Sequence, residues 1–79
     1  MNNINQTIKR LREASGLTIS ELARRSNLKL PHVSRIESGQ YKTLTLPTVR
    51  ALSDGLGISL SRFLEELGFL NDRVNKPSF

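Results

Sequence analysis

A short segment near the middle of the chain gathers side chains that can bind an anion or donate hydrogen bonds. Within residues 28–39, LKLPHVSRIESG, the side chains of Lys29, His32 and Arg35 surround a narrow apolar seam of two residues, Val33 and Ile36. A guanidinium offers a rigid fork of donors and an ammonium offers a point charge, so both suit anionic partners. A helix that only filled a core would carry more apolar residues. This pattern indicates a helix that packs on one side and contacts another molecule on the other.

The residue types needed for catalysis or metal binding are scarce. The chain has one histidine and no cysteine, and it contains neither an H-E-x-x-H pair nor a glycine-rich phosphate loop. The D-G-L-G at residues 54–57 is typical of a helix end rather than of a nucleotide fingerprint. We therefore expect no enzyme, and no cofactor, metal or small-molecule ligand.

The charge is distributed unevenly along the 79 residues. Residues 1–50 carry nine basic and three acidic side chains, a balance of +6, and residues 51–79 carry three basic and four acidic ones, a balance of −1. A basic half beside a nearly neutral half indicates one surface for a polyanion such as nucleic acid, and another surface for something else.

The length allows one small domain, and we find no apolar run of the ~20 residues that a membrane span needs. The N-terminus lacks the basic and then apolar layout of a signal peptide. We therefore expect a soluble cytoplasmic protein that makes no membrane contact. We also expect a domain over residues 1–70 and a short tail over 71–79, where the apolar period is lost and the chain frays.

Apolar residues recur at helical spacing in five segments, and each segment is followed by a residue that ends helices. Glycine or asparagine permits the left-handed backbone that commonly follows a last helical turn. The pattern predicts an all-α domain whose helices end at Ser15-Gly16, Asn27, Gly39, Gly57 and Gly68. We expect the third helix to start at Pro31, with Leu30 extended as its cap, because proline disfavours the α conformation in the preceding residue.

The second and third helices are expected to cross steeply. Thr18-Ile19-Ser20-Glu21 has the form of a capping box, in which the threonine and glutamate satisfy each other's amides. Ala23 lets another helix approach closely, and Asn27 can turn the chain sharply. Two short helices joined by a turn of three or four residues are typical of a helix-turn-helix.

The segments 11-LREASGLTISELARRSNLKLPHVSRIESG-39 and 49-VRALSDGLGISLSRFL-64 resemble the XRE-type, lambda-repressor-like helix-turn-helix family. The resemblance covers about residues 4–68. It implies a compact five-helix DNA-binding domain and a transcriptional regulator. It also implies that helix three is the recognition helix, which enters the major groove while helix two lies across the DNA backbone.

The resemblance further implies which residues contact double-stranded DNA. Arg35 suits a bidentate contact with guanine or a phosphate contact, and Lys29 reaches either of the same two groups. Leu30 either meets thymine methyl groups or folds back onto the core. The base-reading candidates are Lys29, Leu30, Pro31, His32, Ser34 and Arg35. The phosphate candidates are Thr18, Ile19 and Ser20 at the start of helix two and Tyr41, Lys42 and Thr43 in the following loop, with Arg10, Arg24 or Arg25 beside them.

Two residues of this chain differ from the usual family pattern, and the resemblance also implies one ion pair within the domain. The family commonly has glutamine where Ile19 stands, and serine or threonine where Lys29 stands, so no particular operator is implied. Arg12 is assigned to an ion pair with Glu37 that ties the first helix to the third, rather than to DNA.

One recognition helix reads few base pairs, so the resemblance implies a homodimer on a palindromic operator, acting as a repressor or autoregulator. The candidate interface residues are Phe63, Leu67, Phe69 and Leu70, which otherwise close the domain's own core. A different class of function is an antitoxin or adaptor that acts mainly through a protein partner.

Overall fold

Five helices follow one another along residues 3–68, the part of the chain that this computed structural model describes, and no strand occurs there. The expectation of an all-α, five-helix domain is therefore confirmed. The helices are α1 (Ile4–Ala14), α2 (Ile19–Ser26), α3 (Leu30–Glu37), α4 (Leu46–Leu56) and α5 (Leu60–Leu67).

The helix ends follow the local chemistry of the sequence. The capping box at α2 is complete: the Thr18 hydroxyl accepts from the Glu21 amide at 3.0 Å, and the Thr18 amide donates to the Glu21 carboxylate at 2.8 Å. Asn27 ends α2 in the left-handed conformation, with φ 59°. The turn between α2 and α3 is therefore three residues long, as expected.

The start of α3 differs by one residue from the expectation. The helix begins at Leu30, with Lys29 as the extended cap residue, so Pro31 is its second residue rather than its first. An amide at the second position of a helix has no partner within the helix, so proline loses nothing there. Its steric effect on the preceding residue disfavours the helical conformation without forbidding it. The same arrangement recurs at α4, where Pro47 follows Leu46.

Every helix contributes to one hydrophobic core. The side chains with almost no exposed surface come from all five helices: Ile8, Leu22, Val33, Ile36, Leu52 and Phe63. Because α3 supplies only Val33 and Ile36 to this core, most of its surface remains available.

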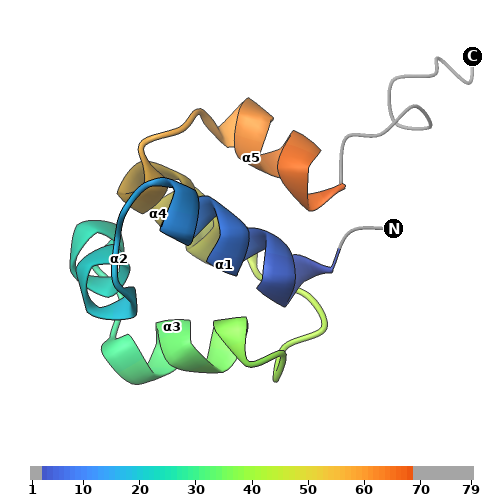
Figure 1. Ribbon diagram of the computed structural model, residues 1–79. Helices are drawn as coiled ribbons and strands as arrows, with labels where there is room; N and C mark the ends of the chain where they lie inside the picture. The colour runs from blue at the N-terminus through green and yellow to red at the C-terminus, as the bar shows by residue number, and fades with distance from the viewer. Residues whose placement is uncertain (1–2, 69–79) are drawn as a thin grey trace, which may run out of the picture.

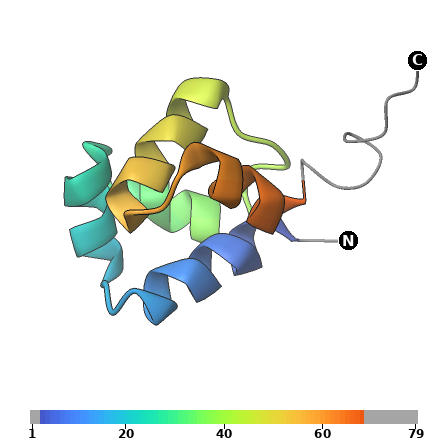
Figure 2. The same ribbon diagram turned by 90° about the horizontal axis from the view of Figure 1, so that it is seen from above.

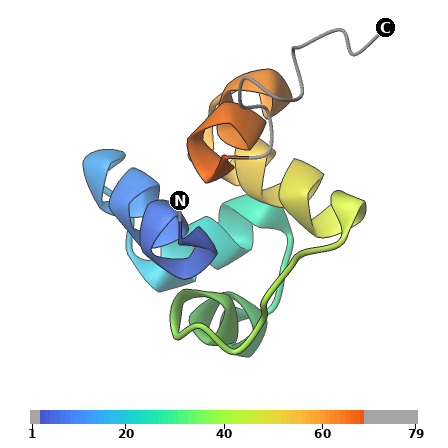
Figure 3. The same ribbon diagram turned by 90° about the vertical axis from the view of Figure 1, so that its right-hand side faces the viewer.

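The recognition-helix candidate and the last helix lie on opposite sides of the molecule (Figure 1). In this view α3 forms the lower edge and α5 the upper edge, with α1 and α4 between them. Figure 3 shows the same order from the side, and Figure 2, viewed from above, shows α5 lying across α1 and α4, both of which it contacts. A ligand bound to the outer face of α3 would therefore lie far from α5.

The helices α2 and α4 approach each other closely at Gly55. An added Cβ at this position would overlap the Ser26 hydroxyl and lie 3.0 Å from Leu22 Cδ1. The sequence indicated only a helix-interior glycine with a cost of roughly 1 kcal/mol relative to alanine. The structure gives the reason for this glycine, which is the packing of α2 against it.

The boundary expected near residue 70 and the tail at 71–79 lie outside the described residues. None of the helices within residues 3–68 has the length and apolar character to cross a membrane.

Candidate nucleic-acid interface

The outer face of α3 is polar and solvent-accessible. Pro31, Ser34 and Arg35 are exposed and occupy the side of the helix opposite Val33 and Ile36. This placement follows from the helical spacing i, i+3, i+4. Within residues 3–68, the Arg35 side chain makes no hydrogen bond or ion pair. Its guanidinium is therefore available to an external partner.

The first turn of α3 adds an apolar and a basic group to this face. Leu30 is 47% exposed, so it does not fold back onto the core, which was one of its two expected positions. Lys29 is exposed, and its side chain forms no capping hydrogen bond. His32, by contrast, is half-buried at the flank of the same turn.

The loop after α3 extends the accessible surface. Tyr41, Lys42 and Thr43 are all exposed there. Gly39 begins the loop with φ +86°, and the Gln40 amide donates to the Arg35 carbonyl at 3.1 Å. The backbone therefore leaves α3 by a fixed, hydrogen-bonded turn. Lys29, Arg35 and Lys42 are all exposed in this region.

The N-terminus of α2 offers fewer groups to a phosphate than the sequence suggested. The capping box uses both the amide and the hydroxyl of Thr18, and it places the Glu21 carboxylate at the helix start. These hydrogen bonds lower the pKa of Glu21, so the carboxylate is charged at neutral pH. The Ile19 side chain packs against the core, which leaves its amide and that of Ser20 as the free donors of the first turn.

An ion pair with little exposed surface holds α3 in place. Arg12 Nε donates to Glu37 Oε2 at 2.7 Å and Nη2 donates to Glu37 Oε1 at 3.0 Å, and the two side chains are only 10% and 6% exposed. This is the pair that the family resemblance implied. Arg12 Nη1 also donates to the Leu17 carbonyl at 2.7 Å. The hydrogen bond to Glu37 raises the pKa of Arg12.

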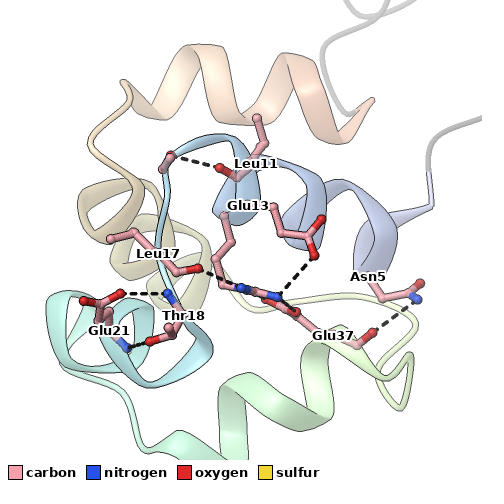
Figure 4. Close-up of polar contacts among 9 residues, drawn as sticks. Asn5, Leu11, Glu13, Leu17, Thr18, Glu21 and Glu37 are labelled. Atoms are coloured by element: carbon pink, nitrogen blue, oxygen red, sulfur yellow. Dashed lines mark hydrogen bonds and ion pairs between the residues drawn. The ribbon is translucent and has the colours of Figure 1, made fainter.

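The surroundings of this pair connect three parts of the chain (Figure 4). Glu37 on α3, Leu17 in the loop before α2, and Glu13 on α1 lie around the guanidinium, with Glu13 Oε2 4.0 Å from Nη2. Asn5 adds a weaker contact, because its side-chain amide donates to the Glu37 carbonyl at 3.4 Å. The sequence carried no local signal for the Leu17 and Asn5 contacts.

Of the arginines expected beside the DNA, Arg10 is engaged elsewhere. It donates to Glu66 on α5 at 2.8 Å, and this bond lowers the pKa of the glutamate. Arg10 therefore ties α1 to α5, on the side away from α3. Arg24 and Arg25 are exposed on α2.

For Phe63 and Leu67, the structure of the described domain favours the second of their two expected positions, the core. Both lie in its own core, with 0% and 2% of their surface exposed. Removing either from the core to contact another chain would cost about 1.5–3 kcal/mol of burial. Phe69 and Leu70, the other two interface candidates, lie outside the described residues.

Comparison with known proteins places these features in a family. A family model described as helix-turn-helix matches residues 8–63. Two similar crystal structures are variants of the restriction-modification controller protein C.Esp1396I. An arginine-to-alanine variant has 31% identity and a TM-score of 0.74, over 85% of this chain and 88% of that chain. A tyrosine-to-phenylalanine variant has 28% identity and a TM-score of 0.76, over 98% and 92%. No curated protein sequence matches significantly.

Proposed function

This chain belongs to the XRE-type helix-turn-helix family of DNA-binding transcriptional regulators, and we propose that it binds a palindromic operator as a homodimer. The observation that supports this proposal best is the outer face of α3, where Arg35 is exposed and without a partner in residues 3–68. The similarity to a restriction-modification controller protein favours a repressor or autoregulator.

We assign base reading to the outer face of α3. Arg35 pairs through its guanidinium with O6 and N7 of a guanine, and Lys29 contacts a guanine or a neighbouring phosphate. Leu30 and Pro31 offer apolar surface to thymine methyl groups, and the 47% exposure of Leu30 supports this role. His32 and Ser34 donate or accept hydrogen bonds at base edges.

Phosphate contacts are assigned to the two segments that flank α3. The amides of Ile19 and Ser20 offer donors and the positive end of the α2 dipole. The loop after α3 adds Lys42 and the hydroxyls of Tyr41 and Thr43. Such contacts fix the register of the protein on the duplex but carry no sequence information.

A homodimer would place two α3 helices in successive major grooves, about 34 Å apart. Since Phe63 and Leu67 are core residues, the partner surface would come from other residues, such as exposed positions of α5. The distance of α5 from α3 in Figure 1 is compatible with this arrangement, because a partner on α5 would leave the outer face of α3 open.

The proposal is tested by selecting bound duplexes from a random pool with the purified protein. The selected duplex is then titrated with the wild type and with Arg35→Ala. We expect the selected site to be palindromic. We expect Arg35→Ala to lose about 1–3 kcal/mol of the binding free energy that discriminates between bases at one symmetric pair of positions. Arg50→Ala is the matched control, because Arg50 is an exposed arginine on α4, outside α3, its flanking segments and α5, and it should bind like the wild type.

If no consensus emerges and binding is weak for every duplex, the operator proposal fails. A protein partner would then become the better explanation. If a consensus emerges that has no two-fold symmetry, only the homodimer part of the proposal fails.

A further inference from the structure

One aromatic contact joins the recognition-helix candidate to the loop that follows it. The ring centroids of His32 and Tyr41 are 5.6 Å apart, and the ring planes meet at 74°, an edge-to-face arrangement. Histidine belongs to the first turn of α3, and tyrosine lies four residues beyond the last helical residue, Glu37. The tyrosine side chain therefore reaches back from the loop toward the start of the helix.

The two rings have different surroundings. His32 is half-buried, whereas Tyr41 is 37% exposed and has no hydrogen bond within residues 3–68. Tyr41 is also one of the few large apolar side chains that the described domain leaves at its surface. Its position is supported by the turn at Gly39 and by the hydrogen bond from Gln40 to Arg35. The contact with the imidazole is thus the only ring contact that Tyr41 makes within those residues.

We propose that Tyr41 is a positioning residue, which holds the His32 ring in the orientation that reads a base edge. This inference rests on the proposed function, because it requires that α3 reads a specific sequence. It differs from the phosphate role assigned to Tyr41, since a phosphate contact would act on all sequences alike.

The physical argument concerns the rotation of the imidazole. The last side-chain torsion of a histidine has broad minima, so an unsupported ring would rotate at an exposed helix start. A neutral imidazole carries its donor and its acceptor on different nitrogens, so the ring orientation decides which of them faces the groove. Edge-to-face packing at this centroid distance favours a restricted set of orientations. Tyr41 therefore prepares His32 to discriminate between bases before the DNA arrives.

The contact also gives the loop a part in specificity. Because Tyr41 already contacts the imidazole without DNA, the loop that meets the DNA backbone also supports the imidazole. A loop that does not fit the backbone would release the ring. Recognition of the backbone and recognition of one base pair are thereby coupled through a single contact.

The test is a base-pair scan of the operator selected by the wild-type protein. Affinities for every single substitution are measured for the wild type, His32→Ala, Tyr41→Ala, Tyr41→Phe and the double variant His32→Ala/Tyr41→Ala. We expect His32→Ala and Tyr41→Ala to lose discrimination at the same base pair, each by about two- to tenfold. The double variant should lose no more than either single variant. Tyr41→Phe keeps the ring and should retain the wild-type discrimination.

Lys42→Ala is the matched control, because it removes a neighbouring loop side chain that makes no ring contact. It should weaken binding equally for all duplexes and leave the discrimination at each position unchanged. Circular dichroism melting checks that each variant is folded.

Two results would overturn the inference. If Tyr41→Ala weakens binding uniformly and leaves the discrimination at every base pair unchanged, Tyr41 acts only through a phosphate contact and does not position His32. If His32→Ala leaves every position unchanged, no base is read by His32. In both cases the wild type still selects an operator, so the proposed function stands. If the wild type selects no sequence, the proposed function fails and this inference fails with it.

Discussion

At the residue scale, the arrangement of α1 and α3 depends on a single buried guanidinium. Arg12 pairs with both carboxylate oxygens of Glu37 and also satisfies the Leu17 carbonyl. A charge in such a place is costly unless it is paired, so the two side chains depend on each other. The pair therefore fixes the orientation of α3 relative to α1.

Arg12→Ala should destabilise the domain by about 3–5 kcal/mol, because it leaves the Glu37 carboxylate buried without its partner. Urea or thermal unfolding measures the loss. Arg62→Ala, which removes an exposed arginine 3.8 Å from Glu66, should change stability by less than about 1 kcal/mol. A double apolar substitution, Arg12→Met/Glu37→Leu, should recover much of the stability. Equal losses for the single and double variants would show that the charge pair itself is not the cause.

The exposure of Leu30 gives a second prediction at this scale. Replacing each thymine of the selected operator with deoxyuridine removes one methyl group at a time. At one position the wild type should lose about 0.8 kcal/mol of binding free energy, which is the contribution of one buried apolar carbon. Leu30→Ala should be insensitive to that same replacement. If wild type and variant respond alike at all positions, Leu30 reads no thymine methyl.

At the element scale, the close packing of α2 on α4 decides the effect of a glycine substitution. Alanine at position 55 would stabilise an isolated helix by roughly 1 kcal/mol. In this domain Gly55→Ala should instead destabilise by about 1–3 kcal/mol, because the added methyl overlaps Ser26. Chemical denaturation distinguishes the two signs.

A second substitution identifies the cause. Ser26 Oγ is buried and makes no hydrogen bond to residues 3–68, so Ser26→Ala removes the overlapping atom without breaking a bond there. Ser26→Ala/Gly55→Ala should therefore recover most of the loss. Asp54→Ala, at the exposed neighbouring position, should change stability by about 0.5 kcal/mol or less. A stabilising Gly55→Ala would contradict the packing argument.

The capping box predicts a pH dependence for α2. The pKa of Glu21 is lower in the folded domain than in the unfolded chain, chiefly because of the hydrogen bond from the Thr18 amide. The contribution of the Glu21 carboxylate to the stability of the domain is therefore complete above its pKa in the unfolded chain. This contribution is lost as the pH falls through its pKa in the folded domain. Glu21→Gln keeps an acceptor but does not titrate, so it should lack this part of the acid destabilisation.

Stability measured between pH 7 and pH 3 tests the point. The difference in the free energy of unfolding between the wild type and Glu21→Gln should be constant near neutral pH and should shrink in acid. Glu65→Gln removes an exposed carboxylate without a hydrogen bond in residues 3–68, and it should track the wild type closely. A constant difference for Glu21→Gln over the whole range would exclude the titration of this cap.

At the scale of the whole molecule, the two sides of the domain differ in what they offer a partner. The α3 side presents exposed cations in Lys29, Arg35 and Lys42, and the α5 side carries the Arg10–Glu66 bond. Binding of DNA to the α3 side releases counterions from the phosphates, whereas an apolar protein interface releases few. Salt dependence therefore separates the regulator from the antitoxin or adaptor alternative.

The logarithm of the association constant should fall linearly with the logarithm of the salt concentration, by about 0.9 for each phosphate neutralised. Lys42→Ala should reduce the slope by about one for each protomer bound, and Arg50→Ala, on α4, should leave it unchanged. Titrations at four or more salt concentrations measure these slopes. A slope near zero for the wild type would favour a protein partner.

The sequence alone determined the features that depend on neighbouring residues. The Thr18–Glu21 capping box, the left-handed Asn27 and the C-terminal ends of the five helices were predictable because caps and turns act over a few residues. The all-α fold followed from the same signals. The Arg12–Glu37 pair was predicted only through the family resemblance, since its partners lie 25 residues apart.

The tertiary structure decided which groups oppose one another across the core. Helical periodicity identified Phe63 and Leu67 as apolar, but it could not tell a domain core from a surface for a second chain. It also gave no sign that Gly55 faces Ser26, that Arg10 reaches Glu66, or that Tyr41 contacts His32. These contacts depend on how the helices pack and on the path of a loop, and packing is set by the whole set of side chains rather than by any one segment.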